Sequence, residues 1–180
     1  MKKQQAFRQL TLALSVPAAS SLQLNVTAIG ARDGSSTLEC WQMNTPFDIS
    51  TQPGTSGSAV ATLSSVSNLS YTIIPSNFDG GIHNAPHAQW VVYTSGMAYV
   101  TLPDDDSTSA VVLGGEFGLV FAADTADVSL KGHRTQYPGL TETIGLQIPT
   151  QDGKVPEHRL LHMGPCTADD IAGLRELAAT

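Results

Sequence analysis

Positive charge is scarce in this 180-residue sequence, which has nine Lys and Arg residues and a formal net charge of -7. The basic residues are scattered, so no basic stripe is available to neutralise phosphates. Charged residues make up 14% of the chain and hydrophobic residues 41%, a globular rather than a disordered composition. We therefore expect a soluble domain that does not bind nucleic acid.

Several familiar functional motifs are also missing. The sequence has no G-x-S-x-G nucleophile turn, no phosphate-binding glycine loop that opens a helix, and no cysteine pair with zinc spacing. The apolar stretch nearest the N-terminus, Leu10–Val16, is far too short to span a bilayer. These absences argue against a serine hydrolase, a nucleotide-binding protein, a zinc finger and a membrane partner.

The first 21 residues combine a basic start, the short apolar stretch and small residues at Ala18–Ser20. This pattern resembles a signal peptide, and the alternative is an N-terminal arm. Two glycosylation sequons, which begin at Asn25 and Asn68, are compatible with secretion. The compartment stays open between the secretory pathway and the cytoplasm.

Only two cysteines are present, Cys40 and Cys166. In an oxidising compartment they could form a disulfide, and in a reducing one they would be two small hydrophobic residues. The sequence does not decide between these states.

Short runs rich in strand-forming residues, separated by turns at intervals of about ten residues, dominate the rest of the chain. Nine such runs are recognisable: Leu22–Gly30, Thr37–Met43, Ala59–Leu63, Leu69–Pro75, Ala88–Gly96, Ala98–Pro103, Ser109–Gly115, Gly118–Asp124 and Thr141–Pro149. With almost no helical pattern, they predict one all-β domain over residues 22–166, a sandwich or a barrel.

One helix is expected, over residues 167–180. Thr167 can cap it, Asp169 and Asp170 lie in its first turn, where the helix dipole favours anions, and apolar residues follow at helical spacing.

The stretch GIHNAPHAQWVVYTSG, residues 81–96, carries the richest set of polar side chains. If the strand includes His87, alternation places His87, Gln89 and Tyr93 on one face. An imidazole, an amide and a phenol on a wall that faces the interior would suit a ligand pocket. His83 precedes this strand, and the two histidines could instead be half-exposed residues of a turn at the rim.

Other polar residues have simpler interpretations. His133 is a candidate site residue or a loop histidine with its hydrogen bonds satisfied. Asp124 and Asp127, in the AADTAD sequence, are expected to be turn formers. His158 and His162 lie in a segment expected to be irregular and are expected at the surface.

The run from Gly81 through His83 and Gln89 to Gly96 resembles the first conserved motif of the cupin superfamily, a glycine, two histidines, a glutamate and a final glycine. The run Phe117–Gly139 resembles the second cupin block. Small single-domain cupin-like proteins of fungi contain sequences similar to ECWQM, QWVV, AADTADVS and LQIPT, so the resemblance covers most of residues 22–166. It implies a double-stranded β-helix, a jelly-roll barrel whose mouth holds a metal or a substrate.

The resemblance also implies which residues a metal would use, since the family binds its metal with three histidines and one carboxylate. His83 matches the first histidine, but Ala85 stands at the second, Gln89 at the carboxylate and Val120 at the second-block histidine. The loss of two imidazoles and of the negative charge predicts that no tight metal site remains.

An alternative keeps a metal. One divalent transition metal could be held by a rebuilt set made of His83, His87, Gln89 and His133.

The preferred function is therefore acid/base chemistry without a cofactor: isomerisation, dehydration or cyclisation of a small polyketide-like secondary metabolite. His83 and His87 would be the acid/base pair, with His133 assisting, because an imidazole gains and loses protons near neutral pH. Gln89 and Tyr93 would orient a substrate oxygen.

Two alternatives remain open. One is a secreted small-molecule-binding or interaction protein with a lost active site, and the other is a metal-dependent dioxygenase. The likeness to cupins also implies a possible homodimer formed through edge strands.

Overall fold

Hydrogen-bonded strands dominate residues 22–171, the part of the chain that the computed structural model describes. A seven-stranded sheet has the order β13 (His158–Met163), β2 (Ser35–Pro46), β1 (Gln23–Arg32), β10 (Leu119–Ala122), β7 (Gln89–Ser95), β12 (Thr143–Pro149) and β5 (Ser70–Ile74). A four-stranded sheet has the order β6 (Phe78–His83), β11 (His133–Tyr137), β8 (Met97–Leu102) and β9 (Asp105–Leu113). The all-β class expected from the sequence is confirmed.

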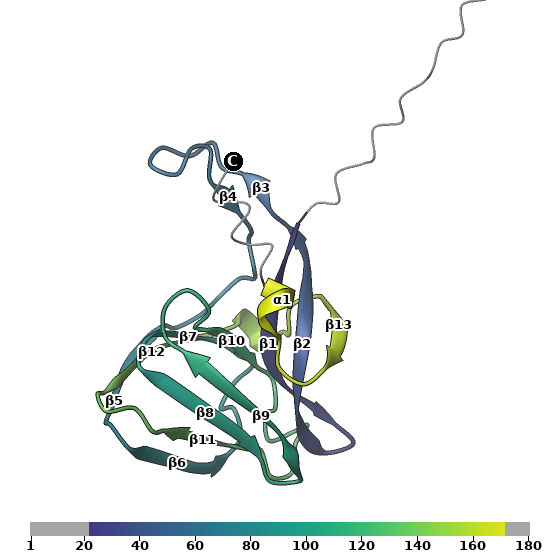
Figure 1. The fold of residues 1–180 in the computed structure, drawn as a ribbon. Coiled ribbons are helices and arrows are strands. Elements are labelled where there is room, and N and C mark those ends of the chain that lie inside the picture. The colour runs from purple at the N-terminus through teal and green to yellow at the C-terminus, as the bar shows by residue number, and fades with distance from the viewer. Residues whose placement is uncertain (1–21, 172–180) are drawn as a thin grey trace, which may run out of the picture.

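Smaller elements complete this part of the chain. Strands β3 (Asp48–Ile49) and β4 (Ala59–Val60) form a separate hairpin, and a short 3-10 turn, η1 (Gln151–Gly153), precedes β13. Figure 1 shows the hairpin projecting away from the two larger sheets. Strands β1 and β10 pair in parallel, whereas the other pairings within the sheets are antiparallel.

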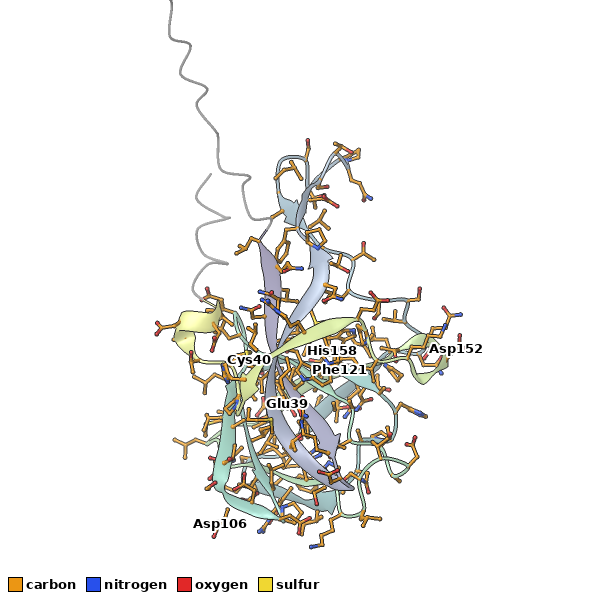
Figure 2. All side chains as sticks on the ribbon, turned by 90° about the vertical axis from the view of Figure 1, so that its right-hand side faces the viewer. Glu39, Cys40, Asp106, Phe121, Asp152 and His158 are labelled. Carbon is orange, nitrogen blue, oxygen red and sulfur yellow. A yellow bond between two sulfur atoms is a disulfide. The ribbon has the colours of Figure 1, made fainter. Side chains whose placement is uncertain are left out.

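All nine runs identified in the sequence contain a strand. The sequence pattern misses four others, which are β3, β6, β11 and β13. The expectation of an irregular segment around His158 and His162 is wrong, because both residues lie in β13, which pairs with β2. His158, which Figure 2 labels, is only partly exposed. Its ring stacks on that of Trp41 with centroids 3.6 Å apart.

The two large sheets pack face to face. Alternate residues of β7 point inward, so Val91 and Tyr93 join a buried cluster that includes Ala98 and Val112 of the opposing sheet. Trp90 directly precedes Val91 in sequence and points to the other face of the seven-stranded sheet, as alternation requires. Every second residue of each strand therefore faces the space between the sheets.

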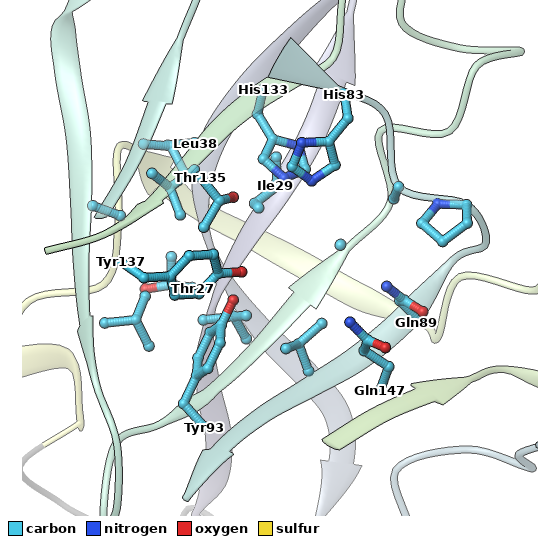
Figure 3. Close-up of a pocket in the computed structure, with 18 residues that line it drawn as sticks. Thr27, Ile29, Leu38, His83, Gln89, Tyr93, His133, Thr135, Tyr137 and Gln147 are labelled. Atoms are coloured by element: carbon cyan, nitrogen blue, oxygen red, sulfur yellow. The ribbon is translucent and has the colours of Figure 1, made fainter. Parts of the chain in front are cut away.

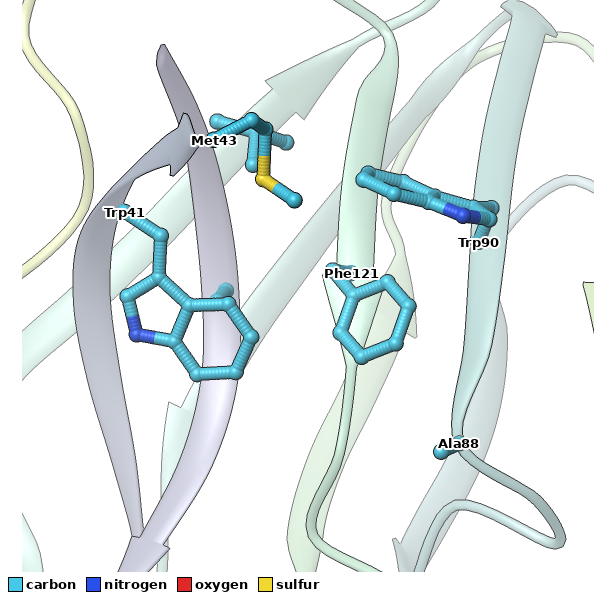
Figure 4. Packing of buried hydrophobic residues seen from close by; sticks show 7 residues of the cluster. Trp41, Met43, Ala88, Trp90 and Phe121 are labelled. Atoms are coloured by element: carbon cyan, nitrogen blue, oxygen red, sulfur yellow. The ribbon is translucent and has the colours of Figure 1, made fainter. Parts of the chain in front are cut away.

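A second apolar cluster covers that other face. Its aromatic members are Trp41, Trp90 and Phe121, with the Trp90 and Phe121 rings 4.7 Å apart in an edge-on arrangement (Figure 4). Edge-to-face aromatic pairs are favourable beyond the area that they bury. This cluster fixes strands β2, β10 and β7, which supply much of the wall between the sheets.

Cys40 of β2 and Cys166 form a disulfide, which settles the question that the sequence leaves open. The segment around Cys166 is also hydrogen bonded to β1, because the Cys166 N–H donates to Oγ1 of Thr27 at 3.0 Å and Asn25 Nδ2 donates to the carbonyl of Asp170 at 2.6 Å. These bonds and the disulfide hold the C-terminal part of the described chain against β1 and β2.

The expected C-terminal helix begins where the sequence places it. Helix α1 (Ala168–Ile171) is preceded by Thr167, whose N–H and hydroxyl both donate to Oδ2 of Asp170 at 2.6 Å. A carboxylate three residues after the cap that reaches back to the cap N–H is a capping-box contact. The remainder of the expected helix, residues 172–180, and the N-terminal segment, residues 1–21, lie outside the described residues.

Between Leu22 and Ile171, no helix is long and apolar enough to cross a membrane.

Candidate functional site

A cavity of about 270 Å³ lies between the two sheets, near the ends of β6 and β11 (Figure 3). Its polar wall residues come from both sheets: Thr27, His83, Gln89, Tyr93, His133, Thr135, Tyr137 and Gln147. Its remaining wall is apolar: Ile29, Leu38, Ala85, Pro86, Val91, Val100, Ala110, Val112, Val120 and Ala122. A few polar groups on an apolar surface are typical of a small-molecule site.

Four of the five site residues expected from the sequence line this cavity: His83, Gln89, Tyr93 and His133. His87 does not line it. Its side chain is exposed and borders a separate, shallow depression with Asn84, Asp127 and η1 residues. The expectation that His87 points inward with Gln89 is wrong, because β7 begins at Gln89 and the strand alternation does not extend back through the turn after Pro86.

His133 is the best-positioned imidazole. It is 4% exposed, and its Nδ1 lies 2.7 Å from Oδ2 of Asp124, which is fully buried. A carboxylate accepts hydrogen bonds, so Nδ1 carries the proton and donates it, which leaves Nε2 with its lone pair for the cavity. The pair resembles the histidine and carboxylate arrangement that many enzymes use to orient a general base.

The expectation that Asp124 only forms a turn is therefore wrong. Its Oδ2 also accepts a hydrogen bond from Ser36 Oγ at 2.7 Å, whereas its Oδ1 is buried without a hydrogen-bond partner among the described residues. A buried carboxylate oxygen without a donor is costly. Oδ2 of Asp124 therefore makes the contacts to Ser36 and His133, and Asp124 fixes the orientation of the His133 ring.

Further hydrogen bonds fix this pair. Ser36 uses its hydroxyl proton for Asp124, so the Ser129 hydroxyl donates to Ser36 at 2.8 Å and accepts from the Gly132 N–H at 3.0 Å. Asn84 Nδ2 donates to the backbone carbonyls of Asp124 and Ser129 at 3.0 and 2.9 Å. The loop between β10 and β11 is thereby attached to the end of β6.

His83 lies beside His133. Their ring centroids are 4.7 Å apart, and the two residues are paired across β6 and β11. His83 Nδ1 lies 3.0 Å from the carbonyl of Gly81, which can only accept a hydrogen bond, so this ring also carries its proton on Nδ1. Nδ1 of each ring is thus used by a neighbouring acceptor, which leaves Nε2 as the nitrogen that can contact a ligand, and Figure 3 shows the two rings at one end of the cavity.

Gly132 permits the close approach of these two strands. Its φ is +78°, and a Cβ there would lie 2.1 Å from the carbonyl oxygen of His83. Gly132→Ala should therefore destabilise the protein by more than about 2 kcal/mol, because left-handed strain and a backbone clash add together. Urea unfolding measures this loss.

Gly153→Ala is the matched control for Gly132. Gly153 also has a positive φ, +66°, but nothing lies within 4 Å of the Cβ that the change would add. Its cost should be limited to about 1 kcal/mol of backbone strain. Equal losses in the two variants would contradict the claim that Gly132 is needed for strand contact.

Two tyrosines occupy another part of the cavity. The rings of Tyr93 and Tyr137 meet edge to face with centroids 6.3 Å apart. Burial raises the pKa of Tyr93 well above its ordinary value, and the adjacent Tyr137 raises it further, while burial also raises the pKa of Tyr137. Both phenols therefore stay protonated at neutral pH.

These shifts predict an alkaline limit to stability. Because the pKa of Tyr93 is higher in the folded than in the unfolded chain, the folded state loses stability as the pH rises above about 10. Tyr93→Phe should weaken this dependence and remove a late component from the phenolate absorbance titration. A Tyr93→Phe protein with the wild-type alkaline titration would contradict the assignment.

Several cavity residues escaped the sequence reasoning: Thr27, Asp124 behind His133, Thr135, Tyr137 and Gln147. For two of them a signal was present. His133, Thr135 and Tyr137 alternate along HRTQY, so a strand there places all three on one face. The contact between Asp124 and His133 has no comparable sequence signal.

The metal ligands that the family resemblance implies can be compared with this wall. Ala85 and Val120 have no side-chain atom that could bind a metal, and Gln89 offers only a neutral amide. The carboxylate of Asp124 is hydrogen bonded to His133 and does not line the cavity. Among residues 22–171, one group of three potential ligands converges, Cys40, His162 and Asp170, and the sulfur of Cys40 is already in the disulfide. The donors at the cavity do not fit the metal site of the resemblance.

Comparisons of the chain with models of known protein families, with curated proteins and with solved structures find no match.

Proposed function

We propose that the cavity is the active site of an enzyme that transfers protons on a small secondary metabolite, in an isomerisation, dehydration or cyclisation. The observation that carries the proposal is the hydrogen bond of 2.7 Å between His133 Nδ1 and the buried carboxylate of Asp124. It orients the second ring nitrogen toward the cavity as a base. His83, Gln89 and Tyr93 keep the proposed roles of second imidazole and oxygen-binding groups, and His133 takes the leading role that the sequence assigned to His83 and His87.

The proposed steps need only side chains on the cavity wall. Nε2 of His133 accepts a proton from a carbon beside a carbonyl group, and the Asp124 carboxylate stabilises the imidazolium that forms. The negative charge that develops on the carbonyl oxygen is met by donors such as the Tyr93 phenol and the Gln89 amide. The imidazolium then returns the proton to another carbon, or to a hydroxyl group that leaves as water.

We also propose the cupin-type double-stranded β-helix as the fold of residues 22–166. Its support is positional: the four residues at the positions of the family's metal ligands come from strands β6, β7 and β10 and from the segment between β6 and β7, and they line a single cavity: His83, Ala85, Gln89 and Val120. If the resemblance arose by chance, these four positions would not be expected to surround one cavity. The likeness then extends to the barrel but not to the metal chemistry.

A second candidate function is a secreted protein that binds a small molecule without converting it. The disulfide between Cys40 and Cys166 favours this candidate, since disulfides persist mainly in oxidising compartments. It predicts ligand binding with no turnover.

Exchange of the carbon-bound protons of a ketone with solvent deuterium distinguishes the two functions. The probe is para-methoxyacetophenone, an uncharged ketone whose methyl protons can be removed by a base, and proton NMR in deuterium oxide follows their loss. We expect chelator-treated protein to accelerate the exchange well beyond the same concentration of free imidazole. A rate no greater than that of free imidazole would contradict the enzyme proposal, and activity that returned only with added metal would favour a metal enzyme.

A further inference from the structure

The cavity wall carries no formal charge. Among the 18 described residues that line it, none is a Lys, Arg, Asp or Glu, although it contains imidazole, amide, phenol and hydroxyl groups. An ion that enters such a site gives up its hydration, and without a partner of opposite charge this costs several kcal/mol. The wall itself therefore supplies no counterion to an ionic ligand.

The basic residues that flank His133 in sequence are engaged elsewhere. Arg134 follows His133, points to the outer face of β11 and forms an ion pair with Asp79, and its hydrogen bond holds the pKa of Asp79 at about 2. Lys131 is paired with Asp104. Neither cation is directed at a ligand in the cavity.

The carboxylate that contacts His133 would repel an anion. Asp124 lies directly behind His133, and its Oδ1 has no hydrogen-bond partner among the described residues. If His133 becomes protonated, Asp124 already balances that charge. A carboxylate or phosphate on the ligand would be left with His83 as its single possible cation.

Oxygen-binding groups occupy separate parts of the cavity. The histidine pair is at one end, the tyrosine pair lies apart from it, and the two amides of Gln89 and Gln147 form a third group (Figure 3). Apolar residues such as Val100 and Val120 make up the rest of the cavity wall. A ligand with an apolar middle and an oxygen at each end would match this distribution.

We propose that the cavity selects uncharged small molecules that carry a carbonyl or ether oxygen at each end, and that it rejects carboxylates and phosphate esters of the same size. This inference rests on the proposed function in that it concerns the same cavity. It adds the class of substrate, which acid/base chemistry alone leaves open.

The test compares two probes of nearly identical shape, para-methoxybenzamide and para-methoxybenzoate. Binding is measured by NMR titration at about pH 8, above the range in which imidazoles usually titrate. We expect the amide to bind at least about 100-fold more tightly than the carboxylate, as an unpaired buried charge requires. Equal binding, tighter binding of the carboxylate, or no binding of either probe would overturn the proposal.

A variant that introduces a positive charge provides a second test. Gln147→Lys places a cation at the cavity wall from a half-exposed position, so its long side chain can reach water and folding should survive. It should improve carboxylate binding at least about tenfold. The matched control is Gln136→Lys, which adds the same charge on β11 outside the cavity, beside Asp79. Equal effects of the two substitutions would show that selectivity arises from overall charge and would overturn the proposal.

Failure of this inference and failure of the proposed function give different results. If ketone exchange is fast but amide and carboxylate bind alike, the substrate class is wrong and the acid/base function stands. If the amide is selected but the protein exchanges no protons, the cavity is a selective binding site and the enzyme proposal fails.

Discussion

Replacing His133 with Asn should lower the rate of ketone proton exchange by about 10² to 10⁴-fold, the usual contribution of a positioned general base. Asn is close in size to part of the imidazole and can still donate to Asp124, so the buried carboxylate is not left without a partner. Binding of para-methoxybenzamide should change far less than the exchange rate. This split between binding and turnover is expected only if the ring acts on the reacting proton.

Another histidine of the same chain provides the control for His133. His162→Asn alters a partly exposed histidine that contacts Asp170, far along the chain from the cavity strands, and the exchange rate should stay near that of the wild type. An equal loss in the His162 and His133 variants would contradict the assignment of His133 as the base.

Asp124→Asn should also lower the exchange rate, by at least about tenfold, because the amide cannot stabilise an imidazolium as a carboxylate does. The matched control is Asp127→Asn. Asp127 belongs to the same AADTAD sequence, but it is exposed and its carboxylate accepts from Thr125 at 2.5 Å. Similar activities of the two variants would show that Asp124 is a structural residue only.

Removal of the disulfide should have the largest effect on stability. Cys40 and Cys166 are 126 residues apart, and closing a loop of this length lowers the entropy of the unfolded chain by an amount worth about 4 to 5 kcal/mol. Domains of this size are stable by about 5 to 15 kcal/mol, so the loss is a large fraction of the total. The double variant Cys40→Ala, Cys166→Ala should unfold at a much lower urea concentration.

Reductant supplies the control for this measurement. It should destabilise the wild-type protein to about the level of the double variant and should have no effect on the variant itself. Thiol titration of the unfolded wild-type protein should find no free cysteine before reduction. A loss below about 1 kcal/mol, or free thiols in the native protein, would contradict the role of this bond.

The sequence was a good guide where local pattern and burial coincide. The alternation along QWVVY correctly placed Gln89 and Tyr93 on the inner face of a strand, because β7 is central in its sheet and both of its faces are covered. Turn residues at intervals of about ten positions likewise separated the nine strands that were expected. These features depend on local preferences that each segment carries by itself.

The strands that carry both site histidines were not predicted. Strand β6 contains Gly80 and Gly81, and β11 reads HRTQY, which alternates but lacks the aliphatic residues that mark the other runs. Each forms a strand because it pairs with the other and because β11 also pairs with β8, contacts made between segments far apart in sequence. His133 therefore looked like a loop residue.

The partner of His133 was equally hidden. Asp124 lies nine residues before His133, in a segment whose Asp and Thr residues favour turns. Its burial depends on Ser36 and Ser129, which no spacing rule connects to it. Conversely, His87 was assigned to the cavity because alternation was extended past the true start of β7.

The most direct test of this account is the position of the ring proton of His133, read from long-range proton–nitrogen NMR spectra of protein with labelled histidine and assigned with the His133→Asn variant. We predict a proton on Nδ1, a bare Nε2, and a shift of the Nε2 resonance when para-methoxyacetophenone is added. A proton on Nε2 with Nδ1 bare, or an Nε2 resonance that the ketone leaves unchanged, would contradict the proposal that His133 is the base.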